Sequence, residues 1–362
     1  MAQALLFTAA RSLAYGARRL LYVICLDLIS IASGDAFIQQ QAQATSFTAV
    51  TCMAISPDGS VAAVGVEAHN PYHAYSVYLF SLADGRLLST FRGSQNLDGV
   101  SSVAFSPDGK ILAICEHSAI RMISLASGTD LSRLKDKEGR SASLTGVAFS
   151  RDGKYLAVSD EFGFRVWDPQ DGKLLFDALG ETERKSFGLH HLAISPSGNV
   201  LAAADADNFL EIDWRKNSQT VQDGHVDGFA FRPDGQAIAF TDGERGGTAT
   251  RIVIRSTVTK RIVRSFLIWT GPVRRFRAIA YSPDGQTLVL GGDALCIYMP
   301  ATGSMKLLYN ANAYADFPQF SSNGKQIVFL SRKGPNDYKV GIWDIAAHRL
   351  LRSIPLPPPP EN

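Results

Sequence analysis

Histidine is the residue type whose placement in this chain could support metal chemistry. Six of the seven histidines fall in polar segments between short apolar runs: His69, His73, His117, His190, His191 and His225. Neutral imidazole is a common metal ligand, but no pair among these residues has the spacing of a dedicated metal site. Loops collect polar residues for simpler reasons. We therefore expect no bound metal and no other cofactor.

A basic segment is the second chemical feature. Between Gly246 and Pro283 the chain has no acidic residue, and its basic residues there are Arg251, Arg255, Lys260, Arg261, Arg264, Arg274, Arg275 and Arg277. Arg274, Arg275 and Arg277 lead into an apolar run, and Trp269 precedes them. Arginines beside aromatic side chains are enriched at interaction hot spots. This edge predicts binding of an anionic partner such as an acidic peptide, whereas nucleic acid would need a broader basic footprint.

Two further segments supply candidate partner-binding residues. "EAHNPYHAY" (67–75) is the longest loop expected on the same side and contains Tyr72 and His73, and "CEHSA" contains His117. These residues and the basic edge share no arrangement of nucleophile and base that would indicate catalysis. The sequence therefore predicts a binding surface at these positions.

The acidic tetrapeptide Ser-Pro-Asp-Gly raises the question of a catalytic carboxylate, and its recurrence answers that question. Identical copies stand at 56–59, 106–109 and 282–285, and degenerate copies stand at 150–153, 195–198, 232–235 and 321–324. Spacings of 50, 44, 45, 37, 50 and 39 residues indicate a repeat architecture. Pro fixes φ, Asp accepts local backbone hydrogen bonds, and Gly adopts a left-handed conformation. The tetrapeptide is therefore predicted to turn the chain.

The flanks of the tetrapeptide repeat as well. An alanine stands two residues before each turn in six copies, and Gln319 takes its place in the seventh. An apolar run such as "YLAVS" or "QIVFL" follows each turn, and then come a variable loop, a third run, a Gly-containing turn and a fourth run. Each repeat is therefore predicted to form four antiparallel strands, running from the innermost to the outermost. On that order we expect the ring to close without an exchanged N-terminal strand.

This pattern resembles the WD40-repeat β-propeller family. "VAFSPDGKILAI", the strand ends Trp167-Asp168 and Trp343-Asp344, and Gly224-His225 match that family's repeat, and the resemblance covers about residues 48–356. Only two repeats end in Trp-Asp, however, and "EIDW" (211–214) reverses the order. The fifth and seventh repeats look more like those of TolB-type propellers.

The resemblance implies an all-β fold: a seven-bladed propeller of four-stranded antiparallel blades over residues 47–356. It implies a non-catalytic scaffold that binds a protein or peptide through one loop face, with no nucleic acid. The alternative is an enzyme or ligand-binding propeller, lactonase-like or quinoprotein-like, with a metal or small-molecule site at the channel mouth. Propellers host both functions, so the fold leaves this choice open.

Composition fits a large globular core. The chain has 362 residues, of which 46% are hydrophobic and 19% charged, and its net charge of +2 indicates no class of partner. Four cysteines are too few and too scattered for a disulfide framework. Three of them, Cys52, Cys115 and Cys296, lie in expected strands and are predicted to be buried thiols.

The ends of the chain lie outside the repeats. Residues 1–46, expected to be a helical or signal-like segment, contain arginines, an apolar stretch at 20–33 and Ala42-Gln43-Ala44, which is the order of a secretory signal. A periplasmic or secreted location is therefore favoured over a cytoplasmic one. The apolar stretch is too short to span a membrane and Asp27 interrupts it. Residues 357–362 form a proline-rich tail that follows the last expected strand.

Overall fold

The computed structural model describes residues 47–69, 75–93, 99–116, 118–134, 143–160, 163–178, 191–204, 208–223, 226–243, 249–269, 276–309, 313–334 and 336–357. All secondary structure within these ranges is β-strand. Phe47–Asn362 forms one compact unit. The predictions for residues 1–46 and for most of the proline tail fall outside the described residues. No helix in the described ranges has the length and apolar character needed to cross a membrane.

The strands follow one another in consecutive groups of four, one group for each sequence repeat. The first four groups are β1 (Phe47–Ile55), β2 (Val61–His69), β3 (Tyr75–Ser81), β4 (Leu87–Arg92); β5 (Val100–Phe105), β6 (Ile111–Glu116), β7 (Ile120–Ser124), β8 (Asp130–Leu134); β9 (Leu144–Phe149), β10 (Leu156–Asp160), β11 (Phe164–Trp167), β12 (Leu174–Asp177); β13 (His191–Ile194), β14 (Val200–Ala204), β15 (Asn208–Asp213) and β16 (Ser218–Asp223). The remaining groups are β17 (Val226–Phe231), β18 (Ala237–Gly243), β19 (Ala249–Ser256), β20 (Ile262–Trp269); β21 (Phe276–Tyr281), β22 (Leu288–Gly292), β23 (Leu295–Met299), β24 (Ser304–Tyr309); β25 (Tyr314–Phe320), β26 (Gln326–Arg332), β27 (Tyr338–Asp344) and β28 (Arg349–Pro355).

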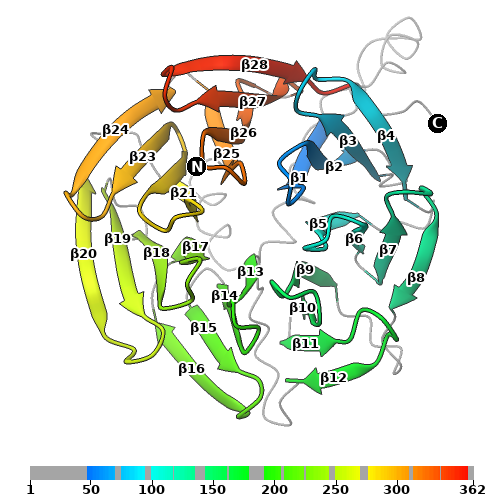
Figure 1. Cartoon of the computed structure of the whole chain (residues 1–362), viewed down its shortest axis with the longest axis horizontal. Coiled ribbons are helices and arrows are strands. Elements are labelled where there is room, and N and C mark those ends of the chain that lie inside the picture. Colours follow the sequence, from blue (N-terminus) through cyan, green and yellow to red (C-terminus); the bar gives the residue numbers. More distant parts are fainter. Residues whose placement is uncertain are drawn as a thin grey trace, which may run out of the picture. The chain divides into compact units, whose positions relative to one another are not determined.

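Each group pairs its strands antiparallel in chain order, as the sequence predicted. Among the described residues, repeats 1 to 5 form five separate four-stranded sheets. The strands of repeats 6 and 7 belong to one eight-stranded sheet because Gly292 of β22 also pairs with Ala315 of β25. In Figure 1 the sheets stand around a central opening, with β1, β5 and β9 innermost and β4, β8 and β12 outermost.

The first strands of the repeats contact one another in cyclic order. The contacts run β1–β5–β9–β13–β17–β21–β25 and return from β25 to β1. Gln319 connects the two ends of this series: its side-chain amide donates to the carbonyl oxygen of Met53 at 3.0 Å, and the N–H of Ile55 donates to its oxygen at 3.2 Å. Among the described strands β28 is outermost in its sheet and β1 pairs within its own, as expected for closure without an exchanged strand.

The core lies between neighbouring sheets. Leu112 and Ile114 of β6, for example, pack in one cluster with Val77 and Leu79 of β3 in the preceding repeat. Second strands are buried almost throughout, whereas fourth strands such as β8 are mainly exposed. A strand covered on both faces must be apolar at consecutive positions, which explains runs such as "ILAIC". Cys52, Cys115 and Cys296 are buried thiols, as predicted.

The tetrapeptide forms the same hydrogen-bonded turn between the first and second strands. In repeat 2, Ser106 Oγ donates to Asp108 Oδ1 at 2.6 Å, Lys110 N–H donates to Asp108 Oδ1 at 3.1 Å, and Ile111 N–H donates to Ser106 Oγ at 2.9 Å. Gly109 has φ of +69°, which glycine adopts without strain. The hydrogen bond from Ser106 lowers the pKa of Asp108 below its usual value. The structural interpretation of the tetrapeptide is therefore confirmed.

Candidate functional site

The structure describes only part of the predicted binding surface. Arg277 lies on the innermost strand β21 and is exposed. Trp269 ends β20, where its backbone pairs with Ala249, but its side chain is outside the described set. The other candidates also lie outside the described residues: Tyr72, His73, His117, Arg274 and Arg275.

Arg277 occupies a position that recurs near the start of the innermost strands. A register shift inserts one extra residue into the first strand, relative to the second strand, in five repeats: Thr51, Ser101, Thr145, Asp227 and Arg277. Such a β-bulge re-aims the side chain of the extra residue. The Ser-Pro-Asp-Gly turn follows one end of each first strand, and these bulges lie near the other end. We call the end with the bulges the loop face.

The bulge residues of repeats 1 to 3 have a local structural role. Thr51 Oγ1 donates to Gly65 O at 3.4 Å, Ser101 Oγ donates to Cys115 O at 3.3 Å, and the Thr145 and Ser159 hydroxyls lie 3.0 Å apart. These hydroxyls thus form hydrogen bonds to the second strand beside each bulge. Asp227 and Arg277 replace them with charged side chains in repeats 5 and 6, so the loop face changes character there.

Arg277 belongs to a charged cluster that spans β21, β25 and β26. Arg332 Nε lies 3.7 Å from Asp316 Oδ2, and the Arg332 guanidinium carbon lies 4.4 Å from the centre of the exposed Tyr314 ring. Both Arg332 and Arg277 interact electrostatically with the half-buried Asp316. We call Arg277, Tyr314, Asp316 and Arg332 the rim cluster. It combines two cations, one carboxylate and an aromatic ring at one end of the innermost strands.

The charge state of Asp316 is set by two opposing effects. Burial raises the pKa of its carboxyl above the usual value of 3.8, and Arg332 and Arg277 oppose that rise without cancelling it. The carboxylate also offsets part of the positive charge of the two arginines. Asp293 also acts on Asp316 and raises this pKa, so the two arginines lie near two carboxylates. Removal of the Asp316 charge would make this surface more positive.

A close approach between strands helps to position this cluster. A Cβ atom at Gly228 of β17 would lie 2.5 Å from the carbonyl oxygen of Arg277. Residue 228 must therefore be glycine for β17 to pack this closely against the bulge of β21.

Asp227, Tyr314, Asp316 and Arg332 were not among the sequence candidates. Asp227, Arg277 and Asp316 all stand three residues before the repeated alanine, or before Gln319 in repeat 7. Alignment of the repeats on that residue would have found the two aspartates. The sequence does not predict that Arg332 lies near Asp316, because that depends on which residues of β25 and β26 are paired in the sheet.

Other carboxylates in the described residues are buried with cations. Glu116 lies 3.1 Å from Arg133 and accepts from the Tyr75 hydroxyl, Asp160 lies 3.0 Å from Arg165, and Glu211 lies 2.6 Å from Arg255. These pairs have structural roles, since each buried charge is compensated. Among the residues with described positions, no group of three His, Cys, Asp or Glu could hold a metal ion.

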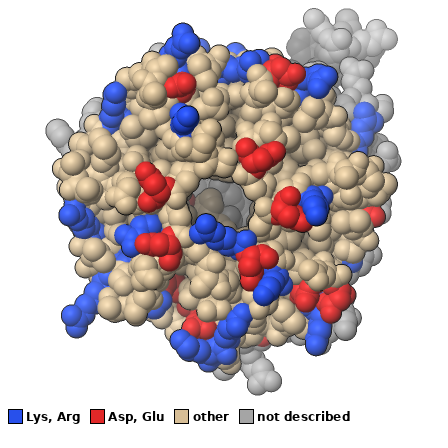
Figure 2. Space-filling model, in the orientation of Figure 1, with Lys and Arg blue, Asp and Glu red and all other residues tan. Residues whose placement is uncertain are grey.

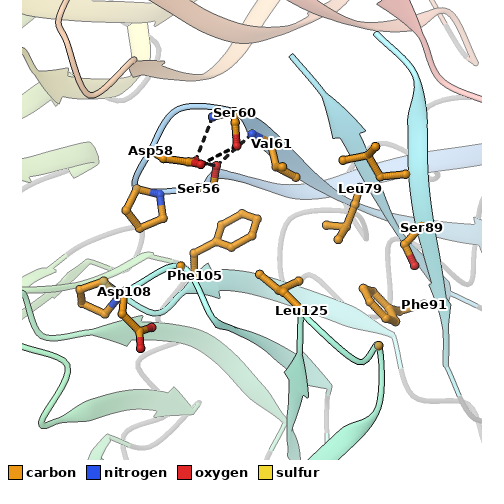
Figure 3. A pocket seen from close by; sticks show the side chains of 15 residues that line it. Ser56, Asp58, Ser60, Val61, Leu79, Ser89, Phe91, Phe105, Asp108 and Leu125 are labelled. Carbon is orange, nitrogen blue, oxygen red and sulfur yellow. Dashed lines mark hydrogen bonds between the residues drawn. The ribbon is translucent and has the colours of Figure 1, made fainter. Parts of the chain in front are cut away.

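A groove of about 570 Å³ lies between repeats 1 and 2, beside the tetrapeptide turns. Figure 3 shows Phe91, Phe105 and Leu125 lining it, and it shows Asp58 bonded to Ser56 and Ser60. Asp58 and Asp108 are both occupied by their own turns. The groove thus offers apolar surface without an available carboxylate.

Figure 2 shows basic and acidic side chains mixed around the central opening.

Comparisons with known proteins agree with the repeat pattern. The family model "WD domain, G-beta repeat" matches residues 85–124 and 131–168. Each matched unit starts near the outermost strand of one sheet and ends with the third strand of the next, so the sequence repeat is offset from the sheet by one strand. Consecutive repeats are thereby linked through shared sheets.

A solved structure, Kuenenia stuttgartiensis hydrazine synthase, is similar with a TM-score of 0.56 and 16% sequence identity, over 68% of this chain and 76% of that chain. At that identity the likeness concerns the fold alone. The resemblance of this chain to WD40-repeat β-propellers, which the tetrapeptide turns and the two Trp-Asp strand ends indicated, is confirmed.

Proposed function

We propose that residues 47–356 form a seven-bladed propeller that acts as a non-catalytic scaffold and binds an acidic protein or peptide segment at its loop face. The rim cluster is the observation that carries this proposal. Arg277 is one of the seven residues expected from sequence to bind a partner, and it is exposed. Like Arg277, Arg332 interacts electrostatically with Asp316, and its guanidinium lies over the exposed Tyr314 ring. Arginine and tyrosine are enriched among the residues that dominate binding energy.

The closed series of first-strand contacts and the seven turns support the seven-bladed form. A rigid ring of sheets suits a scaffold because binding then orders few residues. The carboxylates of the buried ion pairs and of the turns have structural partners, which supports binding in preference to acid–base chemistry.

Charge reversal at Arg277 tests the proposal. The full chain, tagged after Asn362, would be used to enrich partners from its native host and to measure the affinity of the recovered partner. Arg277→Glu is expected to weaken binding by roughly 30-fold, because loss of a hot-spot side chain costs about 2 kcal/mol. The structural role of residue 277 is confined to a bulge, so the variant should fold.

Arg86→Glu is the matched control. Its side chain is 74% exposed in the turn between β3 and β4, at the end of the sheet away from the loop face. This variant makes the same change in net charge and should retain the partner. Equal retention of the partner by both variants would overturn the assignment of the binding face.

A further inference from the structure

We infer that the outer edge of β20 is a second binding surface, where an extended acidic segment of another protein adds to the sheet as a fifth strand. This surface is separate from the rim cluster: β20 is the outermost strand of repeat 5, whereas Arg277 lies on the innermost strand of repeat 6. Figure 1 shows β20 along the outside of the ring, followed by β24.

The backbone of β20 is available for pairing. Within the described residues β20 pairs only with β19. In an antiparallel pair alternate residues direct their N–H and C=O groups toward the neighbouring strand, so the remaining residues direct theirs outward. At eight residues, β20 is the longest of the outermost strands, which otherwise have four to seven. A long unpaired edge is the template that strand addition uses.

The side chains of β20 are also unusual for an edge. Ile262, Val263 and Leu267 are 60%, 62% and 64% exposed, more than any large apolar side chain in the other outermost strands described. Edge strands usually carry outward charges or proline that prevent pairing. The charged residue within β20 is Arg264, and it donates to the carbonyl oxygens of Pro300 and Ala301 in repeat 6. That contact turns its charge away from the edge.

Charge selects the kind of partner. Arg251 lies opposite Leu267 in the β19–β20 register and is exposed, and Arg261 is exposed directly before Ile262. The sequence from Gly246 to Pro283 contains no carboxylate. A second copy of β20 paired edge to edge would bring another basic segment and no carboxylate to this edge, so charge complementarity favours an acidic occupant over a second copy. An extended segment that alternates apolar and acidic residues could pack its apolar side chains against those exposed on β20 and pair its carboxylates with the arginines.

The full-length protein can be tested with a defined probe, an eight-residue peptide of alternating valine and glutamate with blocked ends. We expect measurable binding, with a Kd below about 1 mM. Hydrogen exchange of the free protein should be fast at alternate amides of 262–268 and should slow there when the peptide binds. A version methylated on alternate backbone nitrogens should bind at least about ten-fold more weakly, because it lacks the donors that a strand needs.

Matched variants distinguish this edge from other surfaces. Leu267→Glu should weaken binding by at least about ten-fold, since it removes apolar contact and repels the peptide. Leu131→Glu makes the same change on the outermost strand β8, where Leu131 is 55% exposed, and should bind normally. The hydrogen-exchange readout separates the two proposals, because peptide on β20 slows exchange at 262–268, whereas binding at the rim cluster would slow exchange in β21 instead. Failure here and failure of the loop-face proposal are therefore distinguishable.

Three results would overturn the inference: no detectable binding of the valine–glutamate peptide, equal binding by Leu267→Glu, or slow exchange at all amides of 262–268 in the free protein. A dimer in solution that Leu267→Glu dissociates would overturn it as well, because a second copy would then occupy the edge.

Discussion

Two kinds of charged side chain lie at opposite ends of the innermost strands. At one end the turn aspartates accept from a serine hydroxyl and a backbone N–H within the same turn. At the other end Arg277 is exposed, and Asp316 interacts electrostatically with both Arg277 and Arg332. Local hydrogen bonds make the first set structural, since an acceptor already in use gains little from a ligand. The second set is the one that we propose to bind a partner.

Asp316→Asn tests the electrostatics of the rim cluster. Because the pKa of Asp316 is raised on folding, the folded protein binds this proton more tightly than the unfolded chain does. The wild-type carboxyl therefore adds stability as pH falls through the range just above 3.8, and it costs stability at neutral pH.

The variant should lose this pH dependence without losing stability at pH 7. It should also bind the acidic partner more tightly, because one negative charge is removed. Denaturant midpoints between pH 4 and 7 and the affinity of the enriched partner would check both points. Weaker binding by Asp316→Asn would contradict the acidic nature of the partner.

At the scale of elements, the buried Glu211–Arg255 ion pair connects two sheets that are already joined by apolar packing. Glu211 of β15 lies 2.6 Å from Arg255 of β19, and Arg255 stacks over the rings of Phe209 and Phe240. Such a pair can be replaced by apolar side chains at little cost, but removal of one partner leaves a buried charge uncompensated. The same pair thus predicts opposite results for single and double substitution.

Glu211→Leu is expected to lower the free energy of unfolding by about 3 kcal/mol, because it leaves Arg255 buried without its carboxylate. The double variant with Arg255→Met should recover most of this loss. Lys216→Met, which removes an exposed partner of Asp213, should change stability by less than about 1 kcal/mol. Urea unfolding measures all three, and a double variant less stable than Glu211→Leu would exclude this explanation.

At the scale of the whole molecule, repeats 1 and 7 meet through a shared apolar cluster and through a side chain that departs from the repeat. Six repeats have alanine two positions before the turn, and repeat 7 has Gln319. Its amide bonds both Met53 and Ile55 of β1. The first and last repeats meet without an exchanged strand in the described residues, so side chains must supply the polar contacts between them. Ser322 adds one more, to the carbonyl oxygen of Asp58 at 3.3 Å.

Gln319→Ala restores the repeat pattern but removes both hydrogen bonds to β1. We expect a loss of about 1 kcal/mol for each bond and faster hydrogen exchange across β1, since the Ile55 N–H loses its acceptor. The exposed Gln286→Ala serves as control and should match the wild-type protein. Unchanged exchange in β1 would show that apolar packing alone closes the ring.

The sequence by itself determined the repeat, the four strands in each group, the turn and the buried thiols. These depend on local rules: Gly109 must take a positive φ, and an inner strand such as "ILAIC" must be apolar on both faces. Arg277 was also within reach of sequence reasoning, because its place before an innermost strand follows from the strand order.

Only the tertiary structure decided which of these residues meet. Arg332 reaches Asp316 through the β25–β26 register, Gln319 reaches β1 across most of the chain, and Glu211 finds Arg255 across two sheets. The exposure of Leu267 depends on β20 being outermost with nothing described beside it. Such contacts join segments far apart in the chain, and side-chain geometry selects them after backbone pairing is set. The periodicity of a sequence carries no information about that geometry.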